Sequence, residues 1–588
     1  MIKSRLLQTC CFIKVLLLSL PIVTASSQVY SQEKLDSDSK ELYESMLAGG
    51  ALKTCSSFSQ SNCKVKNFSN EIKKEILYEL NDISLNRLDL FIQTTNNSLS
   101  KNLLKPIYEK LQKLDKYQAV NKNTLFDILE ENKLYQRVNT LPDSAYYALL
   151  DHLELKQITP KGERKKEIAN VLQSNSEAAI QIYQRFVEQV TLRAKSQNTT
   201  PHILVVTASS RDAFEVVDFY TSVFSSLNIK TTWLPINPSL SHAIELSNLD
   251  SAICEKIDKI HNQYNLFDRE RLYPELYQQQ VSYCKEPELL EELINSAQGI
   301  FINGGDQSKT LNSITTSTYE FHGFWKRVLH KVSQKELIVG GTSAGAAVQA
   351  GKSFNRVAIP MISNGISKNA IERGAFAALA PSIRCTSNNC DEAILADDLT
   401  YMPSGGANTF TVGTVDTHFS ERDREGRLIV LALSQRTRLA VGVDETTAMF
   451  YSKNNDVINL EVVGENGVFM IDGQNSMLKM TNVEGNITKQ YAGYAHYLPN
   501  GVEAALNLNT NNWSLSNNIQ MITKRKTLNQ LDDGIWRNST RKYCGTSEPI
   551  AWEIDSNQYL VSPNKDTQFF IDANRKYCGY LYLPFLVQ

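Results

Sequence analysis

Ser343 stands in a run of small residues that could expose a nucleophile. Residues 340–351 read GGTSAGAAVQAG and follow the apolar residues 337–339 (LIV), which predict a buried strand. Glycines at 341 and 345 would allow a tight strand-to-helix turn, presenting the Ser343 hydroxyl beside the free N–H groups of a new helix. That arrangement suits attack on a carbonyl carbon, with the oxyanion held by backbone donors. Because G-x-S-x-G is also typical of ordinary turns, the neighbouring segments decide between the two interpretations.

Three other segments combine with this turn. The sequence NGGDQ at 303–307 follows the predicted strand 299–303, and its glycines would let the backbone approach a ligand closely. Residues 415–428 read VDTHFSERDREGRL, and residues 442–448 read GVDETTA. They offer a histidine, carboxylates and an arginine series close to one another in sequence.

The four segments together resemble the cyanophycinase-like family of serine peptidases, which also contains aspartyl dipeptidases and is related to class I glutamine amidotransferases. The motifs G-G-D-Q, G-G-T-S-A-G-A-A, D-x-H-F-x-x-R-x-R-x-x-R-L and G-x-D-E-x-T-A occur in the family order, over about residues 200–475. The resemblance implies an α/β fold, a flavodoxin-like or class I glutamine amidotransferase-like parallel sheet with a nucleophile elbow. It implies no cofactor.

The resemblance also implies roles for individual residues. Ser343 would be the nucleophile and His418 the general base, which later protonates the leaving amine. The backbone N–H groups of Ala344 and Gly305 would form the oxyanion hole. The residues that match the family's substrate pocket are Gln307, Asp416, Arg422, Arg424 and Arg427. Arginines pair with carboxylates through bidentate hydrogen bonds, and Asp416 could do the same for a guanidinium group.

Each of these residues also has a plain structural interpretation. His418 could be an ordinary core or surface histidine, and Gln307 a loop cap. The arginine series, interleaved with acidic residues, could be a solvated edge. Asp444 and Glu445 are expected to hold a turn rather than take part in chemistry.

One departure from the family concerns the acid that orients the histidine. The family places it shortly after the serine, but residues 349–371 contain neither Asp nor Glu. Asn364 occupies the best-matching position and could orient an imidazole, although it would stabilise the imidazolium less. Glu372, Asp391 or Glu392 could supply the acid instead. Reduced or lost activity is a third interpretation.

The N-terminus and the cysteines both predict export. Lys3, Arg5 and Lys14 precede an apolar stretch at 15–23, and the small residues before position 26 suit cleavage of a signal peptide spanning 1–25. The eight remaining cysteines favour disulfides, and the preferred pairing is local. These pairs are Cys55–Cys63, Cys254–Cys284, Cys385–Cys390 and Cys544–Cys578. No metal site is expected, because C-x-x-C is absent and the eight histidines do not cluster beside cysteines.

Length and periodicity predict several domains within the 588 residues. Helical spacing, as at 72–80, 103–111 and 177–193, predicts a helical N-terminal domain over 26–195, beginning with a polar leader or loop to about residue 60. Apolar strands at 202–207, 230–236 and 299–303, with a helix at 213–227, predict a parallel sheet. The peptidase domain would cover 196–475, with a helical insertion at 237–290, and a small β-rich region would cover 476–588. The sequence RKYCG at 541–545 and 575–579 could mark two similar hairpins.

The leading hypothesis is an exported serine peptidase, secreted or periplasmic, that cleaves a polyamide rich in Asp and Arg. Cyanophycin would be converted to β-aspartyl-arginine dipeptides through an acyl-enzyme. Other isoaspartyl or aspartyl peptides are an alternative, and so is a non-catalytic binding or adhesion protein with a degenerate peptidase domain. An α/β-hydrolase esterase is disfavoured, because its oxyanion motif H-G-G-G is absent. A formal net charge of −2 gives no nucleic-acid signature. No membrane partner is expected after signal cleavage, and a homodimer is one expected assembly.

Overall fold

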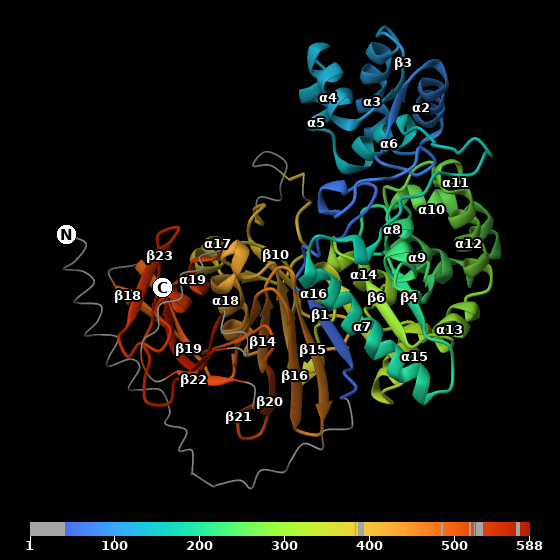
Figure 1. Ribbon diagram of the computed structural model, residues 1–588. Coiled ribbons are helices and arrows are strands. Elements are labelled where there is room, and N and C mark those ends of the chain that lie inside the picture. The colour runs from blue at the N-terminus through green and yellow to red at the C-terminus, as the bar shows by residue number, and fades with distance from the viewer. Residues whose placement is uncertain are drawn as a thin grey trace.

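A nine-stranded sheet runs through the centre of the computed structural model (Figure 1). The structure describes residues 41–382, 384–385, 393–483, 486–516, 519–522, 524, 533–571 and 577–588, so the expected signal peptide lies outside the described residues. The strand order is β21-β20-β16-β15-β1-β7-β6-β4-β5, and the part from β1 to β5 is parallel. The strands are β1 (Ser45–Ala48), β4 (His202–Val206), β5 (Lys230–Trp233), β6 (Gly299–Ile302), β7 (Ile338–Thr342), β15 (Thr447–Asn454), β16 (Val457–Gly464), β20 (Glu503–Asn507) and β21 (Trp513–Leu515).

Helices cover both faces of the parallel part, which explains why its strands are apolar throughout. On one face Ile203 and Val205 of β4 join a core with Phe186 of α7 (Glu177–Ser196). On the other face Leu204 and Val206 join a core with Trp325 of α15 (Gly323–Ser333). The predicted strands at 202–207, 230–236, 299–303 and 337–339 are therefore confirmed, with ends that differ by up to three residues. The helix predicted at 213–227 is the shorter α8 (Val217–Ser225).

The strand β1 corrects the prediction of a leader or loop over 26–60. It pairs in parallel with β7 and antiparallel with β15, so four residues near the N-terminus lie in the middle of the sheet. All four are buried. The helical residues that follow are consequently inserted between β1 and the remaining strands.

The inserted helical unit has a core of its own (Figure 1, top). Its helices are α2 (Asp82–Thr94), α3 (Ser98–Leu111), α4 (Lys122–Glu131), α5 (Tyr135–Asn139) and α6 (Asp143–Leu153), beside a small pair of strands, β2 (Tyr78–Leu80) and β3 (Tyr117–Val120). The helix predicted at 72–80 is wrong, because that segment ends in β2. Leu80 enters the unit's core from this strand, so its apolar spacing serves packing without a helix.

Most of the residues at 237–295, where the sequence predicts a helical insertion at 237–290, form helices. They form α9 (Pro238–Ser247), α10 (Ile257–Gln263), α11 (Arg269–Leu272), α12 (Pro274–Lys285) and α13 (Glu288–Asn295). The disulfide Cys254–Cys284 joins the turn before α10 to α12. Between β6 and β7 lies α14 (Gln307–Ile314), followed by α15. After β7 come α16 (Ala344–Ala347), α17 (Ser367–Arg373) and α18 (Glu425–Gln435).

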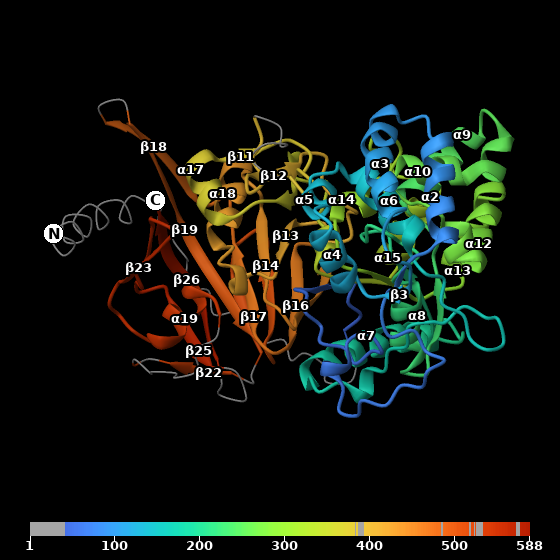
Figure 2. The ribbon, with the colours of Figure 1, turned by 90° about the horizontal axis from the view of Figure 1, so that it is seen from above.

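A second, ten-stranded sheet makes up the C-terminal side of the molecule (Figure 2). Seven of its strands lie in the β-rich region predicted at 476–588, and β13, β14 and β17 precede that region. Its main path is β13-β14-β17-β19-β26-β24-β23, and only β13 and β14 in it are parallel to each other. Its strands are β13 (Gly413–Thr417), β14 (Leu439–Val443), β17 (Gly467–Ile471), β18 (Met477–Val483), β19 (Asn486–Pro499), β22 (Gln520–Ile522), β23 (Ile550–Ile554), β24 (Asn557–Val561), β25 (Gln568–Ile571) and β26 (Cys578–Val587). Between β7 and β13 the chain forms the short strands β8 (Ser353–Phe354), β9 (Val357–Ala358), β10 (Met361–Asn364), β11 (Ala375–Phe376) and β12 (Leu399–Met402).

The two RKYCG segments do not form similar hairpins. The first closes α19 (Ile535–Lys542), whereas the second leads into β26 and includes residues outside the described part. The disulfide Cys544–Cys578 joins them. Cys55–Cys63 is likewise formed, while the fourth predicted pair includes Cys390, which lies outside the described residues.

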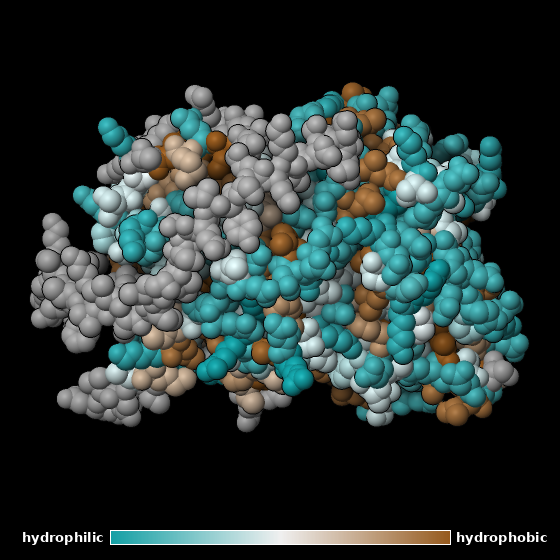
Figure 3. All heavy atoms as spheres, turned by 90° about the horizontal axis from the view of Figure 1, so that it is seen from below, coloured by the Kyte–Doolittle hydropathy of each residue, from teal (hydrophilic) through white to brown (hydrophobic). Residues whose placement is uncertain are grey.

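Hydrophilic side chains cover most of the surface that Figure 3 shows in colour, with apolar ones in scattered patches. Scattered exposed apolar residues such as Leu249 and Ile83 are ordinary for a folded chain. Within the described ranges, no helix combines the length and apolarity that crossing a membrane requires.

Candidate active site

Ser343 lies in a sharp turn between β7 and α16. Its backbone has φ 54° and ψ −120°, a strained combination for a residue with a side chain. A Cβ on Gly345 would lie 2.2 Å from the carbonyl oxygen of Ile302, so only glycine lets this turn pack against β6. The predicted glycine pattern thus produces the abrupt strand-to-helix turn that exposes the hydroxyl.

His418 meets this hydroxyl from the second sheet. Its Nε2 lies 2.8 Å from the Ser343 Oγ, although 75 positions separate the two residues. His418 follows directly after β13 and has a positive φ of 49°, which turns the ring out of the strand direction. The elbow and the histidine therefore come from different sheets and meet where the two sheets adjoin.

Glu445 is the third member of this chain of hydrogen bonds. Its Oε1 lies 2.6 Å from the His418 Nδ1. A carboxylate at this distance binds the Nδ1–H tautomer, which leaves the Nε2 lone pair facing Ser343. Glu445 follows β14, the parallel neighbour of β13, and so both residues lie at the same edge of that sheet. The sequence predicts that Glu445 holds a turn, and the structure adds a direct contact with the imidazole.

Asn364 does not take the place that the sequence suggested for it. Its side-chain amide donates to the carbonyl oxygens of Ala396 and Asp398, which joins β10 to the segment before β12. Of the alternative acids, Glu372 is exposed in α17, and residues 391–392 lie outside the described part. The correct signal was the D-E pair after β14, because the carboxyl ends of parallel strands meet at one edge.

The surroundings of His418 act on its basicity in opposite directions. Burial lowers the pKa of His418, and the hydrogen bond and charge of Glu445 partly offset this, while Arg422 and Arg424 lower it further. The imidazole is therefore neutral at neutral pH and able to accept a proton.

Buried charges from the C-terminal region hold the loop that carries Glu445. Asp444 accepts hydrogen bonds from the Ser420 N–H and the Tyr497 hydroxyl and pairs with Arg537 at 2.8 Å. Burial opposes ionisation of Asp444, but Arg537 outweighs it and lowers the pKa. Glu421 accepts the Glu445 N–H and also binds Arg537, while burial raises its pKa to about 7. Arg537, from α19, thus holds the Glu445 loop in place through its contacts with Asp444 and Glu421.

Two backbone N–H groups lie in the turns beside the nucleophile. Gly304 lies beside the nucleophile, since a Cβ there would be 3.3 Å from the Ser343 Cβ. Within the described ranges, the N–H groups of Gly305 and Ala344 donate to no other backbone carbonyl. This arrangement is compatible with the oxyanion hole expected from the sequence, and the role itself stays a prediction.

The five residues expected to line the substrate pocket have different surroundings in the structure. Gln307 donates to the Ile362 carbonyl at 2.6 Å, and Arg422 is exposed beside the site. Asp416 and Arg427 instead bind each other through two hydrogen bonds of 2.8 and 2.5 Å and are almost wholly buried. Arg424 donates to the Thr417 carbonyl at 2.6 Å. The placement of Asp416 and Arg427 in a pocket wall is thus corrected, because each already satisfies the other's charge beneath β13.

The segment after β1 forms the floor of the site, which sequence reasoning missed. The Ala48 carbonyl accepts from the Ser343 N–H, and the Gly49 carbonyl accepts from the His418 N–H at 2.7 Å. Gly50 has φ +106°, and a Cβ there would lie 2.3 Å from Cε1 and 2.4 Å from Nε2 of His418. The imidazole therefore rests on a glycine nearly 300 positions before the nucleophile.

Comparison of the sequence with known proteins finds similarity to cyanophycinases. The chain is 24% identical over 272 residues to the cyanophycinase of Geminocystis herdmanii (strain PCC 6308), covering 46% of this chain and 70% of that protein. It is 30% identical over 189 residues to the cyanophycinase of Synechococcus elongatus, covering 32% of this chain and 46% of that protein. The chain is related to the cyanophycinases. The matched part covers less than half of this chain in both comparisons.

Two other comparisons add little to this relationship. No protein-family model matches the chain. A crystal structure of a peptidase from an acI-B1 Actinobacterium aligns with 50% of this chain and 87% of that one, at 15% identity and a TM-score of 0.29. That score is below the level at which two folds can be equated.

Proposed function

We propose that this protein is an exported serine peptidase of cyanophycinase type, secreted or periplasmic, with a class I glutamine amidotransferase-like catalytic domain. The observation that carries the proposal is the hydrogen-bonded series from Ser343 through His418 to Glu445. The sequence similarity to cyanophycinases supports a polyamide peptide as the substrate. The three disulfides with both cysteines in the described part support an oxidising compartment.

The proposed reaction uses these three side chains in turn. The Ser343 Oγ attacks the carbonyl carbon while the His418 Nε2 takes its proton, and Glu445 stabilises the imidazolium that forms. The N–H groups of Ala344 and Gly305 stabilise the oxyanion. When the carbon–nitrogen bond breaks, His418 gives the proton to the leaving amine. Water then attacks the acyl-enzyme by the same steps and releases the carboxylic acid product.

Cyanophycin is the first substrate to test. The protein lacking residues 1–25 should release β-aspartyl-arginine dipeptides from cyanophycin granules, as detected by mass spectrometry. Parallel reactions with isoaspartyl and aspartyl peptides separate the substrate classes. Release from peptides but not from granules would exclude cyanophycin and retain the mechanism. No hydrolysis of any of these substrates would contradict the proposal.

One observation favours the second substrate class, isoaspartyl or aspartyl peptides without arginine. Asp416, the residue expected to bind a substrate guanidinium, is buried and already paired with Arg427. Recognition of an arginine side chain through this carboxylate would require breaking that buried pair, which is costly.

Gly50 offers a test of how the base is positioned. We expect the methyl group of Gly50→Ala to push the His418 imidazole away from Ser343. This should lower kcat by about 10²-fold or more, since a displacement near 1 Å is enough for such a loss. Gly162→Ala is the matched control, because Gly162 also has a positive φ (+82°) but nothing lies within 4 Å of its Cβ position. Both variants carry the same kind of backbone strain, so thermal unfolding should shift in both. Equal kcat values in the two variants would remove Gly50 from the positioning of His418.

A further inference from the structure

The turn after β6 contains two successive glycines, and the peptide bond between them carries one donor of the proposed oxyanion hole. That bond joins the Gly304 carbonyl to the Gly305 N–H. In the described part of the chain this N–H has no acceptor. A trans peptide points its carbonyl and its N–H in opposite directions, and none of the described peptide bonds is cis. Whatever fixes the carbonyl therefore also fixes the donor.

The two glycines make this peptide easy to turn over. Gly305 has φ +142°, a value that side chains disfavour, and a Cβ there would lie 2.2 Å from the Ser209 carbonyl oxygen. Glycine takes either sign of φ at little cost, so a peptide between two glycines can rotate about its flanking bonds. A Cβ on Gly304 would lie 3.3 Å from the Ser343 Cβ. The turned peptide would thus present a carbonyl beside the nucleophile, where the reaction requires a donor.

The side chain of Asn303 holds the Gly304 carbonyl. Its Nδ2 donates to this carbonyl at 2.8 Å and to the Ser210 Oγ at 2.7 Å, while its Oδ1 accepts the Ser209 N–H at 3.0 Å. Because the Ser209 N–H requires an acceptor, the amide oxygen must face it, and the NH₂ group then faces the Gly304 carbonyl. Asn303 is 1% exposed, so water does not compete for these hydrogen bonds.

The loop that Asn303 binds is itself anchored. Ser209 is buried, and its carbonyl accepts the Asp306 N–H at 2.7 Å. Two residues further on, Arg211 donates to both oxygens of Asp151 in α6, at 3.0 and 2.9 Å. The inserted helical unit therefore holds the loop against which Asn303 positions the peptide.

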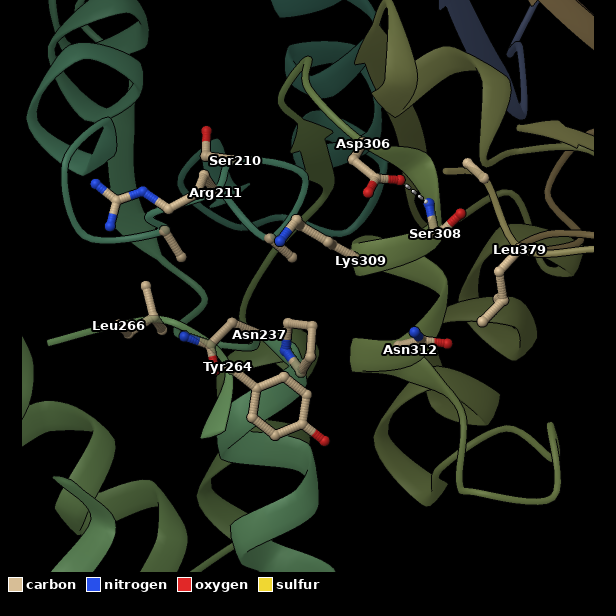
Figure 4. A pocket seen from close by; sticks show the side chains of 14 residues that line it. Ser210, Arg211, Asn237, Tyr264, Leu266, Asp306, Ser308, Lys309, Asn312 and Leu379 are labelled. Carbon is tan, nitrogen blue, oxygen red and sulfur yellow. Dashed lines mark hydrogen bonds between the residues drawn. The ribbon is translucent and has the colours of Figure 1, made fainter. Parts of the chain in front are cut away.

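Packing restrains this turn less than the hydrogen bonds do. A cavity of about 250 Å³ adjoins the turn, and Ser210 and Asp306 are among the residues that line it (Figure 4). The close packing that keeps a backbone from shifting in a protein interior is therefore missing on this side. The hydrogen bonds of Asn303 are consequently the restraint that acts on the peptide itself.

We propose that Asn303 is a positioning residue, which fixes the 304–305 peptide with the Gly305 N–H toward the oxyanion. Its amide supplies an acceptor for Ser209 and a donor for Gly304 at the same time, which a carboxylate cannot do. The inference rests on the proposed function and extends it to a side chain that acts through the backbone.

Asn303→Asp is the main test, because it keeps the size and the acceptor but replaces the donor with a second oxygen. The carboxylate would repel the Gly304 carbonyl and accept the Gly305 N–H, two residues on, as Asp side chains commonly do in turns. We expect kcat to fall by about 10²- to 10³-fold, the loss typical of one missing oxyanion donor, with KM within about threefold of wild type. Asn312→Asp should behave as wild type, because it adds the same charge at an exposed position of α14.

Asn303→Ala is the second variant, and it serves if thermal unfolding shows that the buried charge of Asn303→Asp prevents folding. It removes the contacts without adding a charge and leaves the peptide free to take either orientation. We expect kcat to fall by about tenfold, a change in equilibrium that one hydrogen bond can produce, again with little change in KM. A loss expressed in KM alone would overturn the inference, and so would an equal loss of kcat in Asn312→Asp.

Crystal structures keep this inference separate from the proposed function. In wild type the Gly304 carbonyl should face the Asn303 amide, and in Asn303→Asp the peptide should be turned over, whether or not the protein hydrolyses any substrate. That result without hydrolysis by wild type would support the role of Asn303 and contradict the peptidase proposal. The same peptide orientation in both structures, or a wild-type kcat in folded Asn303→Asp, would overturn the role of Asn303 and leave the peptidase proposal intact.

Discussion

Replacing Ser343 by alanine is expected to lower kcat by about 10⁴-fold or more, because binding and oxyanion stabilisation alone leave only a small residual rate. In the proposed reaction the Ser343 Oγ forms the covalent bond to the substrate's carbonyl carbon, and this oxygen lies 2.8 Å from the His418 Nε2. A loss of this size corresponds to about 5 kcal/mol of transition-state stabilisation. Dipeptide or peptide release under single-turnover conditions measures it directly, and labelling by a fluorophosphonate probe should disappear in the same variant.

Ser333→Ala is the matched control for this experiment. Ser333 is an exposed serine at the end of α15. Its hydroxyl donates to the His330 carbonyl and accepts a long hydrogen bond of 3.5 Å from the neighbouring Gln334 side chain. It should retain wild-type rates and probe labelling. Equal rates in wild type and Ser343→Ala would remove Ser343 from the mechanism, and a lowered unfolding temperature in Ser343→Ala alone would point to structural damage.

The elements that could be predicted from the sequence are those with a local signal. The buried strand at 202–206 and the helix at 177–196 show their periodicity within a few residues, and both formed as predicted. The strand β1 has four residues in a polar stretch and no pattern of its own. Its partners lie about 300 and 400 positions away, so only the sheet defines it.

The candidate site shows the same division. Motifs predict both Ser343 and His418, because the turn that carries the serine and the strand end that carries the histidine each have a recognisable sequence of adjacent residues. The prediction for Asn364 is wrong because its amide is used to join β10 to the segment before β12, away from the His418 Nδ1. Glu445 reaches His418 through the pairing of β13 with β14, a relation that becomes visible only once the strands are placed side by side. Asp416 and Arg427 have complementary charges that satisfy each other, which motif matching does not reveal.

The site depends on parts of the chain that lie far from its motifs. The segment after β1 supports the imidazole, and Arg537 in the C-terminal region pairs with Asp444 beside the Glu445 loop. The disulfide Cys544–Cys578 anchors the end of α19, which carries Arg537, to β26. Deleting the C-terminal region would therefore leave Asp444 buried and uncompensated, at a cost of several kcal/mol.

Glu445→Gln is expected to lower kcat by about 10²- to 10⁴-fold, because a glutamine can stabilise the wrong imidazole tautomer and carries no charge for the imidazolium. The pH profile gives a second, signed readout. Wild-type kcat/KM should fall as His418 becomes protonated, below pH 6.5, since burial lowers its pKa from that value. Glu445 raises the pKa of His418 through its hydrogen bond and charge, so removing the charge should move this acid limb to still lower pH.

Glu465→Gln is the matched control, because it neutralises an exposed carboxylate in a nearby loop. It should leave both kcat and the acid limb unchanged. A Glu445→Gln variant with the wild-type kcat would show that Glu445 only holds a turn and that Ser343 and His418 act as a pair. An acid limb that stayed in place would show that the charge of Glu445 does not reach His418 in solution, because loss of an interacting anion favours the neutral imidazole and lowers the pKa.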